Sequence, residues 1–507
     1  MKASDTRNAK SENVENSIGR GITLMNSILL FSLRVLTIIT AFAGLWDYLQ
    51  FVSPREIEYA TELRDHSEHR VVKQTITQIG ETFVRFRPDT PANFTGSWPC
   101  FRGVARDNLP KDNVSLVKSW EQEGPRVLWR ESLGEGYAGA IIADGRVYVL
   151  DYLEEKNADA LRCFALLTGE ELWQRSYHNP IRRNHGKSRT VPAYSDGVVV
   201  TFGPAAHVMA VDAVSGDLLW TRDLVREYQC EVPQWYAGQC PFIDKGKVIL
   251  GIGGKEVLMT ALDLATGQVV WELPNPDGIQ MSHSSVLPTV LAGCEQYVYA
   301  GIGGIVACHP DGTLLWQCKT WKPAVWAPTP VKIGENRLFL TAGYGAGSAL
   351  LRVQNENGTL VPVIDQAWKP TKGPASEQQT PLVMDGKLFV IQPKDAGGLR
   401  SELLAADVDL LPDILASSGK EARFGLGPYL FADNAFWIVD DNGGLHVYEF
   451  ENNAFRLLAY HRVLPGVDSW GPIACAGGIM ILRDATSMVC LDLRHPLLSE
   501  NREGKRP

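Results

Sequence analysis

The sequence predicts an all-β fold in which eight similar units of four strands close into a ring. Three observations support this prediction: a tight-turn motif that ends in tryptophan, an apolar strand that recurs in every unit, and a proline ahead of nearly every unit. The chain of 507 residues is long enough for such a ring, since units of about 40–50 residues carry four strands each. The predicted architecture is therefore an eight-bladed β-propeller.

The tight-turn motif places a glycine four residues before a tryptophan. Its Thr-Gly, Ser-Gly or Asp-Gly pair is typical of a hairpin turn in which glycine adopts a positive φ. We expect the tryptophans, as structural residues of the repeat, to pack between neighbouring units. The motif occurs as TGEELW at 168–173, SGDLLW at 215–220, TGQVVW at 266–271 and DGTLLW at 311–316, which end in Trp173, Trp220, Trp271 and Trp316.

The apolar strand recurs eight times between Val147 and Met480, at intervals of 40 to 51 residues. The last unit ends near Leu493 with too few strands. We expect the segment GPRVLWRESLG at 124–134 to supply its missing outer strand and so remove an open edge. The eight copies are GRVYVLD, GVVVTFG, GKVILGIG, QYVYAGIG, NRLFLTAG, GKLFVIQ, NAFWIVDD and GGIMILRD.

Seven of the eight units carry a proline 4 to 10 residues ahead of the apolar strand. Proline lacks an N–H, so it suits the start of an innermost strand whose unpaired side faces the central channel. The residues just before these prolines should then rim the channel. Arginine forks and tryptophan faces there would suit a flat anionic ligand; alternatively, the same side chains plug the channel and stack on one another. The predicted rim consists of Arg189, Gln239, His283, Trp326, Gln378, Arg423 and Trp470.

A basic loop between the first two units stands out from an acidic chain, whose net charge is −9. It would attract a carboxylate, a phosphate or an acidic partner; the alternative is a solvated loop paired with local acids. The overall charge excludes a general nucleic-acid binder, which needs a basic face. The loop contains Arg182, Arg183, His185 and Lys187.

Other motifs favour structural interpretations. His283 lies among three serines, but no G-x-S-x-G elbow surrounds them, so we reject a hydrolase. The turn DDNG that begins at Asp440 suits an ordinary turn better than a calcium loop, and no metal site is predicted. The nine cysteines form no C-x-x-C motif. They are either buried thiols or include a disulfide between Cys230 and Cys240.

The amino-terminal part predicts a membrane tether. Residues 22–46 are long enough to cross a bilayer, and their thirteen Leu, Ile, Phe and Val residues outweigh the cost of Arg34. Basic residues ahead of this span place the preceding tail, 1–21, in the cytoplasm and the bulk in the periplasm. The alternatives are a cleaved signal ending near Ala43 and an interfacial helix. We expect a helical stalk or linker over 47–95, the propeller over 96–494 and a disordered tail over 495–507.

Two segments resemble a known family. ALDLATGQVVW at 261–271 and AVDAVSGDLLW at 210–220 resemble the A-x-D-x-x-T-G-x-x-x-W repeat of pyrroloquinoline-quinone (PQQ) dehydrogenases. SWPCFRGVARDN at 97–108 resembles the W-P-x-x-R-G-x-x-R-D segment ahead of the blades in membrane-tethered PQQ-like propellers. More distantly, the chain is similar to the outer-membrane assembly factor BamB. The resemblance implies the fold but not the function, because this repeat serves several.

Departures from these families set the functional expectation. The chain has neither the adjacent cysteine pair of many PQQ dehydrogenases nor a haem motif, and no cysteine before Cys100 offers a lipobox. We therefore expect a non-catalytic ligand-binding or protein-interaction scaffold at the cell envelope, with no assigned cofactor and an anionic small molecule or protein on the propeller face. The alternative is a PQQ-dependent alcohol dehydrogenase that uses PQQ with calcium.

Overall fold

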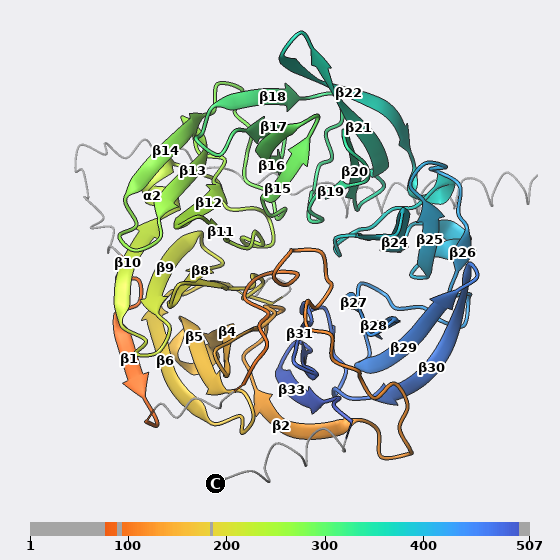
Figure 1. Ribbon diagram of the computed structural model, residues 1–507. Coiled ribbons are helices and arrows are strands. Elements are labelled where there is room, and N and C mark those ends of the chain that lie inside the picture. Colours follow the sequence, from red (N-terminus) through yellow and green to blue (C-terminus); the bar gives the residue numbers. More distant parts are fainter. Residues whose placement is uncertain (1–76, 89–93, 183–185, 496–507) are drawn as a thin grey trace, which may run out of the picture. The chain divides into compact units, whose positions relative to one another are not determined.

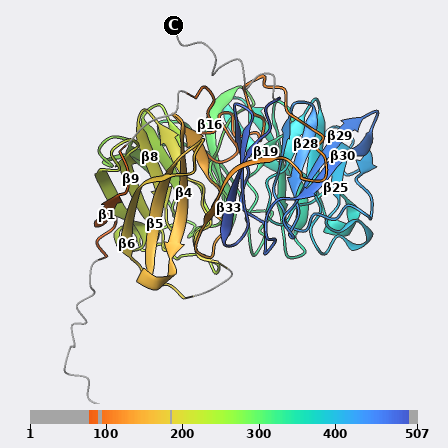
Figure 2. The same ribbon diagram turned by 90° about the horizontal axis from the view of Figure 1, so that it is seen from below.

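The computed structural model describes residues 77–88, 94–182 and 186–495. These residues form eight antiparallel sheets that surround a central channel as the blades of a propeller (Figure 1). In the edge-on view of Figure 2, the strands of the first blade stand roughly along the channel axis. The predicted all-β, eight-bladed architecture is confirmed.

Blades 1 to 4 occupy the first half of the ring. In each, four consecutive strands run outward from the innermost strand. They consist of β3 (Ile141–Ala143), β4 (Arg146–Leu153), β5 (Ala158–Ala165) and β6 (Glu171–His178); β7 (Ala193–Ser195), β8 (Val198–Phe202), β9 (His207–Asp212) and β10 (Leu218–Asp223); β11 (Phe242–Asp244), β12 (Lys247–Gly251), β13 (Val257–Asp263) and β14 (Val269–Pro274); and β15 (Leu287–Leu291), β16 (Cys294–Gly301), β17 (Gly304–Cys308) and β18 (Leu314–Cys318).

Blades 5 to 8 complete the ring. They consist of β19 (Val331–Lys332), β20 (Arg337–Ala342), β21 (Gly347–Glu356) and β22 (Thr359–Trp368); β23 (Leu382–Met384), β24 (Lys387–Ile391), β25 (Leu403–Asp407) and β26 (Ala416–Ser417); β27 (Tyr429–Ala432), β28 (Ala435–Val439), β29 (Gly444–Glu451) and β30 (Ala454–Arg462); and β31 (Ala474–Ala476), β32 (Ile479–Arg483), β33 (Ser487–Asp492) and β2 (Arg126–Ser132). The short helices are η1 (Glu154–Lys156), α2 (Leu224–Tyr228), η2 (Pro370–Lys372) and η3 (Gly397–Leu399).

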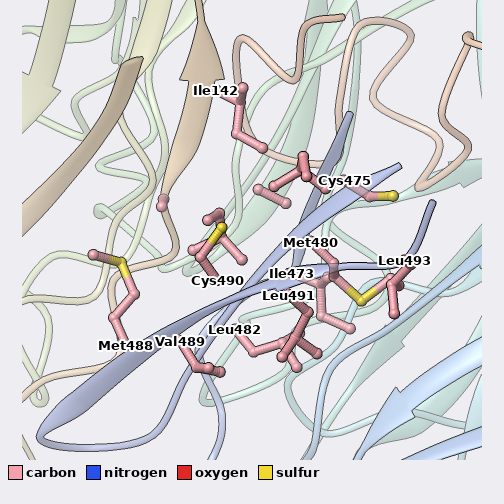
Figure 3. Packing of buried hydrophobic residues seen from close by; sticks show 14 of the residues in the cluster. Ile142, Ile473, Cys475, Met480, Leu482, Met488, Val489, Cys490, Leu491 and Leu493 are labelled. Atoms are coloured by element: carbon pink, nitrogen blue, oxygen red, sulfur yellow. The ribbon is translucent and has the colours of Figure 1, made fainter. Parts of the chain in front are cut away.

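The eighth blade takes its outermost strand from the amino-terminal side of the ring, as predicted. Strand β2 pairs antiparallel with β33, and a bulge between Val127 and Trp129 shifts the register. Figure 3 shows the apolar core that this blade shares with its neighbours, including Ile142 of β3, Met480 of β32 and Leu491 of β33. Hydrogen bonds along its edge and apolar packing on its face therefore hold the closing strand in place.

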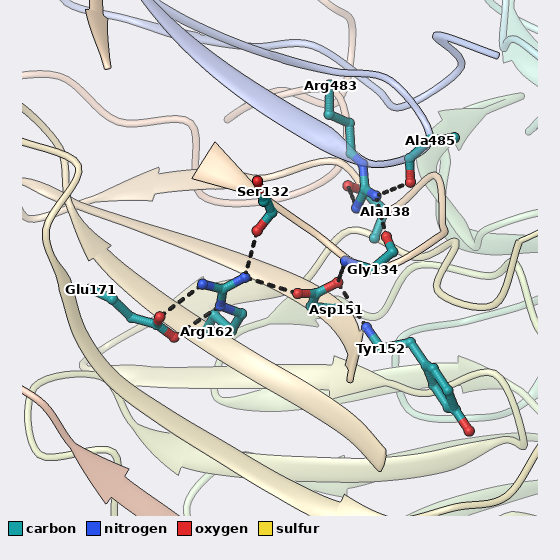
Figure 4. Close-up of polar contacts among 9 residues, drawn as sticks. All are labelled: Ser132, Gly134, Ala138, Asp151, Tyr152, Arg162, Glu171, Arg483 and Ala485. Atoms are coloured by element: carbon teal, nitrogen blue, oxygen red, sulfur yellow. Dashed lines mark hydrogen bonds and ion pairs between the residues drawn. The ribbon is translucent and has the colours of Figure 1, made fainter. Parts of the chain in front are cut away.

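Two arginines hold the chain between β2 and β3, where the ring closes (Figure 4). Arg162 forms ion pairs with Asp151 (3.0 Å) and Glu171 (2.8 Å) and donates to the Ser132 carbonyl (2.9 Å). From the other side, Arg483 donates to the carbonyls of Ala138 (3.1 Å) and Gly134 (3.3 Å). Because charged donors satisfy these carbonyls at the seam, the crossing from blade 8 to blade 1 is fixed in place.

The repeat tryptophans pack between blades, and their glycines adopt a positive φ, as predicted. Trp220 lies against Gly267 of the next blade, where an added Cβ would meet its ring at 2.5 Å, and its indole donates to the Leu264 carbonyl (2.8 Å). Because the tryptophan ring lies so close to the turn, only glycine fits at this turn position. The other motif tryptophans that face a glycine of the following blade are Trp173 with Gly216 and Trp271 with Gly312. Trp316 instead donates to Gln296 of its own blade (2.6 Å).

The recurring apolar strand is the second strand of each blade, and the prolines mark the innermost strand. Pro192, for example, immediately precedes β7, and Pro381 immediately precedes β23. The loops ahead of the innermost strands therefore gather at one mouth of the channel, which places the candidate site described below.

The amino-terminal predictions have mixed outcomes. Of the segment expected to form the stalk, the structure describes the part from residue 77 onward. There the chain forms a turn and then the strand β1 (Thr82–Arg85), which pairs with β6 and adds a fifth, outermost strand to blade 1. The helical prediction is wrong over this stretch because the open edge of β6 offers main-chain partners, while Phe83 packs beside the blade 1 core. The anchor at 22–46 lies outside the described residues. None of the described helices has the length and apolar character needed to cross a bilayer.

Candidate ligand-binding site

A cavity of about 290 Å³ lies at the mouth of the central channel where the innermost strands begin. This volume is near the lower end of the range for small-molecule sites. Its walls come from loops of all eight blades and from the segment ahead of β2. The residues that line it include Tyr137, Arg189, Trp235, His283, Tyr344, Glu377, Gln378, Lys394 and Trp470, with Phe101 from the preceding segment.

The structure brings four of the seven predicted rim residues to this cavity: Arg189, His283, Gln378 and Trp470. The other three lie elsewhere. The Gln239 amide is buried against Gly251, Trp326 is buried in the core between blades 4 and 5, and Arg423 donates to nearby carbonyls, including that of Arg400 (3.1 Å). The loops ahead of the prolines turn differently, so distance from the proline in sequence does not fix where a side chain points.

Aromatic side chains provide two sides of the cavity. Trp235 and Tyr344 are nearly parallel, with ring centres 5.3 Å apart and planes at 13°, and Tyr137 and Trp470 lie 4.8 Å apart at 38°. Faces of this kind stack on flat ring systems. The proline spacing identified only Trp470, because the other three lie at irregular loop positions.

Tyr344 occupies an unusual backbone position. Its φ is +56°, a left-handed value that is rare for a residue with a large side chain, and the residue is 60% exposed. The sequence GYGAGS around it forms the turn between β20 and β21. The position costs conformational energy, yet it carries the phenol ring to Trp235 on a loop two blades away. Strain of this kind is common where a side chain serves a binding site.

Positive charge enters the cavity from blade 2. The Arg189 guanidinium carbon lies 5.4 Å from the centre of the Tyr137 ring, and burial lowers the pKa of Arg189 to about 10, so the group stays charged at neutral pH. Burial, aided by the charge of Arg189, lowers the pKa of His283 to about 4. His283 is therefore neutral near pH 7, and Arg189 is the charged group of this wall.

The opposite wall carries an acid and a second cation. Partial burial raises the pKa of Glu377, while Lys394 opposes that shift through its charge and its backbone N–H. The Lys394 ammonium lies over the ring of Trp470, 5.7 Å from its centre. Trp470 is itself held by a hydrogen bond from its indole to Asp441 (2.7 Å). Sequence reasoning missed both Glu377 and Lys394; the only signal for Glu377 was its position beside Gln378.

The segment 97–108 closes the inner side of the cavity. Arg102 donates to the carbonyl of Pro381 (2.8 Å) and Arg106 to that of Val286 (3.2 Å), so the segment reaches the inner strands of two blades. Figure 1 shows this part of the chain crossing the centre of the ring. Both arginines are buried and adopt a positive φ, which turns the backbone and leaves Phe101 against the cavity. The segment is thus a plug across the channel.

Comparisons with known proteins agree with this architecture. Residues 157–409 match the family model described as outer membrane protein assembly factor BamB. Among curated proteins, the quinoprotein alcohol dehydrogenase PedH of Pseudomonas putida is 28% identical over 181 residues, a stretch that covers 34% of this chain and 28% of PedH. The match thus spans little more than a quarter of that relative.

Two solved structures share the fold. The quinohemoprotein alcohol dehydrogenase ADHIIG of Pseudomonas putida superposes with a TM-score of 0.54 at 13% identity, covering 80% of this chain and 83% of that one. The quinohemoprotein alcohol dehydrogenase of Comamonas testosteroni gives 0.53 at 14% identity, covering 79% and 81%. The chain is a PQQ-like β-propeller. At these identities, the structural likeness extends to the fold alone.

The basic loop of this PQQ-like propeller is only partly described, because Arg183 and His185 lie outside the described residues. Lys187 is buried, forms an ion pair with Glu154 and lies over the ring of Tyr152, with its nitrogen 3.9 Å from the ring centre. Lys187 therefore pairs with a local acid, as in the second interpretation of the basic loop given above, a solvated loop paired with nearby acids. Arg182 is exposed.

The remaining motifs of the propeller have structural roles. The Ser282 hydroxyl donates to the Ala300 carbonyl (2.6 Å), and the Ser285 hydroxyl accepts from the backbone N–H of Cys240 (3.0 Å), so neither serine is poised against His283. Asp440 caps its own turn and contacts His446 (2.8 Å). Among the described residues, no group of three or more His, Cys, Asp or Glu side chains is placed to hold a metal ion.

The disulfide alternative between Cys230 and Cys240 is wrong. Both thiols are free and buried, and they belong to the apolar cores of different blade junctions. The Cys240 sulfur accepts a hydrogen bond from the backbone N–H of Val191 (3.2 Å). Burial raises the pKa of Cys240 to about 11, as expected for a thiol that acts as a small apolar side chain.

Proposed function

We propose that this PQQ-like propeller is a non-catalytic binding protein that takes a flat anionic small molecule into the pocket at the mouth of its channel. One observation carries the proposal: two aromatic pairs and the partly buried, charged Arg189 line a single cavity. Aromatic faces supply stacking for a ring system, and a partly desolvated guanidinium supplies a charge-assisted hydrogen bond to a carboxylate. The plug closes the far side, so the ligand reaches the pocket from the loop face.

The PQQ cofactor of the named relatives is a flat anion of this class. Arg189 would face one of its carboxylates, and Trp235 and Trp470 would offer ring faces. When bound, such a quinone supplies two-electron oxidation of an alcohol. The described residues contain no clustered metal ligands, and the sequence has no adjacent cysteine pair. The donor set thus fits a flat anion in general, and we assign no calcium ligands.

The test uses naphthalene-2-carboxylate as the probe, with 2-naphthamide as its uncharged counterpart, and measures binding by isothermal titration calorimetry. We expect the carboxylate to bind more tightly than the amide. Arg189→Ala should weaken carboxylate binding tenfold or more, which corresponds to about 1.4 kcal/mol, and should leave amide binding nearly unchanged.

Arg423→Ala is the matched control, because this arginine comes from an equivalent loop yet contacts main-chain carbonyls outside the pocket. Its binding should equal that of the wild type. Equal affinity for the carboxylate and the amide, or equal effects of the two arginine substitutions, would overturn the proposal.

The dehydrogenase alternative rests on the local match to PedH. It is tested by incubating the purified protein with PQQ and calcium and following dye reduction with a panel of primary alcohols. Sustained turnover would replace the binding function with a catalytic one. Native mass spectrometry of the purified protein adds a separate readout: a retained small mass supports a ligand, whereas a retained protein supports a scaffold.

The cellular location of the propeller is also part of the proposal. The apolar span at 22–46 and its basic flank support a cytoplasmic-membrane anchor with the propeller in the periplasm. Amino-terminal sequencing of the mature protein tests retention of the span. A mature chain that begins near Gly44 would indicate a cleaved signal instead.

A further inference from the structure

We infer that the pocket selects a ligand with two unlike ends: an oxyanion that faces Arg189 and an N–H or O–H group that donates to Glu377. This inference rests on the proposed function and deepens it. It assigns Glu377 as the residue that distinguishes such a ligand from other flat anions of the same size.

The two residues face each other across the channel. Arg189 precedes β7, the innermost strand of blade 2, and Glu377 precedes β23, the innermost strand of blade 6. In a ring of eight blades, the second and sixth are diametrically opposite (Figure 1). Both side chains line the same cavity. A ligand that spans the cavity therefore meets a cation at one end and a carboxylate at the other.

The Glu377 side chain is fixed in position. A Cβ added to Gly343 would lie 2.4 Å from its Cγ, so this glycine leaves the room that the side chain fills. The charge and the backbone N–H of Lys394 hold the pKa of Glu377 below the value that burial alone would give. The Lys394 ammonium is directed over the Trp470 ring, 5.7 Å from its centre. The carboxylate is thus held in place with accepting capacity left for a ligand, since a carboxylate accepts several hydrogen bonds.

Tyr344 connects the two ends. Burial raises its pKa, the charge of Glu377 raises it further, and the charge of Arg189 lowers it. The phenol therefore lies within electrostatic range of both residues. Its ring is stacked on Trp235, and both rings line the cavity with Arg189 and Glu377. A ring compound that packs against these aromatic side chains can point one end toward Arg189 and the other toward Glu377.

Charge decides which groups the ligand carries. A second anion beside Glu377 would place like charges together in a partly desolvated pocket, which is strongly unfavourable. A neutral donor there would form a hydrogen bond to a charged acceptor, which is stronger than one between neutral groups. The pocket should therefore prefer a ring carboxylate with a donor at its far end.

The experiment compares two fused-ring probes of nearly the same shape, indole-5-carboxylate and benzofuran-5-carboxylate. Only the indole has an N–H, and it lies at the end away from the carboxylate. We expect the wild-type protein to bind indole-5-carboxylate at least fivefold more tightly than benzofuran-5-carboxylate, measured by isothermal titration calorimetry.

Glu377→Leu should abolish this preference by weakening binding of the indole and leaving binding of the benzofuran unchanged or stronger. Glu421→Gln is the control, because this exposed acid does not line the cavity. Circular dichroism establishes that the variants are folded.

The outcomes separate the two proposals. If both probes bind equally to the wild type while Arg189→Ala weakens both, the anion pocket stands and the inference about Glu377 is overturned. A preference that survives Glu377→Leu overturns it as well. If neither probe nor naphthalene-2-carboxylate binds, the proposed function fails, and this inference fails with it.

Discussion

The indole N–H of Trp129 in β2 donates to the main-chain carbonyl of Leu166 in blade 1, at 2.7 Å, across the seam where the ring closes. The same relationship joins Trp220 to Leu264 between blades 2 and 3. The seam therefore repeats the contact found between blades that are continuous in sequence, although its tryptophan precedes the first blade.

Trp129→Phe should destabilise the propeller by about 1–3 kcal/mol, because it leaves the buried Leu166 carbonyl without its donor and removes part of the packed ring. Urea unfolding measures the change. Trp120→Phe is the comparison, since its indole makes only a long, exposed hydrogen bond to Tyr460 (3.4 Å). Equal losses in the two variants would contradict a special role for the seam.

Gly169→Ala should cost more stability than Gly197→Ala. Both glycines adopt a positive φ, +73° and +77°, so the backbone strain of the substitution is similar. A Cβ at Gly169 would meet the Trp129 ring at 2.5 Å, whereas a Cβ at Gly197 meets nothing within 4 Å. The difference in unfolding free energy between the two variants therefore reports the tryptophan contact, and we expect about 1–3 kcal/mol. A difference near zero would mean that the ring moves aside.

Arg102→Met should loosen the plug. The side chain is buried, and its guanidinium donates to the Pro381 carbonyl, so the apolar replacement leaves that acceptor unsatisfied at a cost of about 1–3 kcal/mol. Limited proteolysis between residues 97 and 108 should become faster than in the wild type. Lys111→Met is the control, because Lys111 pairs only with the nearby Asp107 at the surface. An unchanged cleavage rate would indicate that the other contacts of the segment, such as those of Arg106 and Asn108, hold it without Arg102.

Acid should destabilise the protein partly through His283. Burial and Arg189 lower its pKa to about 4, below the value of about 6.5 expected in the unfolded chain. The unfolded state therefore binds the proton more readily, so the contribution of this residue to stability is retained above about pH 6.5 and falls as the pH drops toward 4.

His283→Asn should reduce the loss of unfolding free energy between pH 7 and pH 4.5 relative to the wild type, by about 1–2 kcal/mol. Denaturant unfolding at each pH gives the comparison. His178→Asn is the control, because this histidine is exposed. The same pH dependence in wild type and His283→Asn would show that His283 does not contribute.

The ring could be predicted from the sequence, whereas most of the pocket could not. The strands repeat because each blade buries the same faces, so TGQVVW and its copies mark the turns, and the unpaired segment at 124–134 identified the closing strand. The pocket residues lie on loops whose sequences do not repeat from blade to blade. Trp326, at a rim-like position, turned into the core, while Tyr344 reaches the pocket from the turn between β20 and β21.

The helical prediction failed at β1 for a related reason. Ile79 and Phe83 are four residues apart, a spacing that suits one face of a helix, and both positions do pack on blade 1. The open edge of β6 offers main-chain hydrogen bonds that no local pattern reveals. Tertiary pairing thus overrides local periodicity in a short segment.

The pairing of β2 with β33 also imposes an order on biosynthesis. The closing strand ends at Ser132, and its partner begins at Ser487, 355 residues later in the chain. At about 5–20 residues per second, the ribosome needs roughly 20–70 s to deliver that partner. Throughout this interval the nascent chain carries an unmatched strand with an exposed Trp129, a target for chaperones and for wrong pairing with a second nascent chain. The ring therefore cannot close until the carboxy-terminal blade has been synthesised.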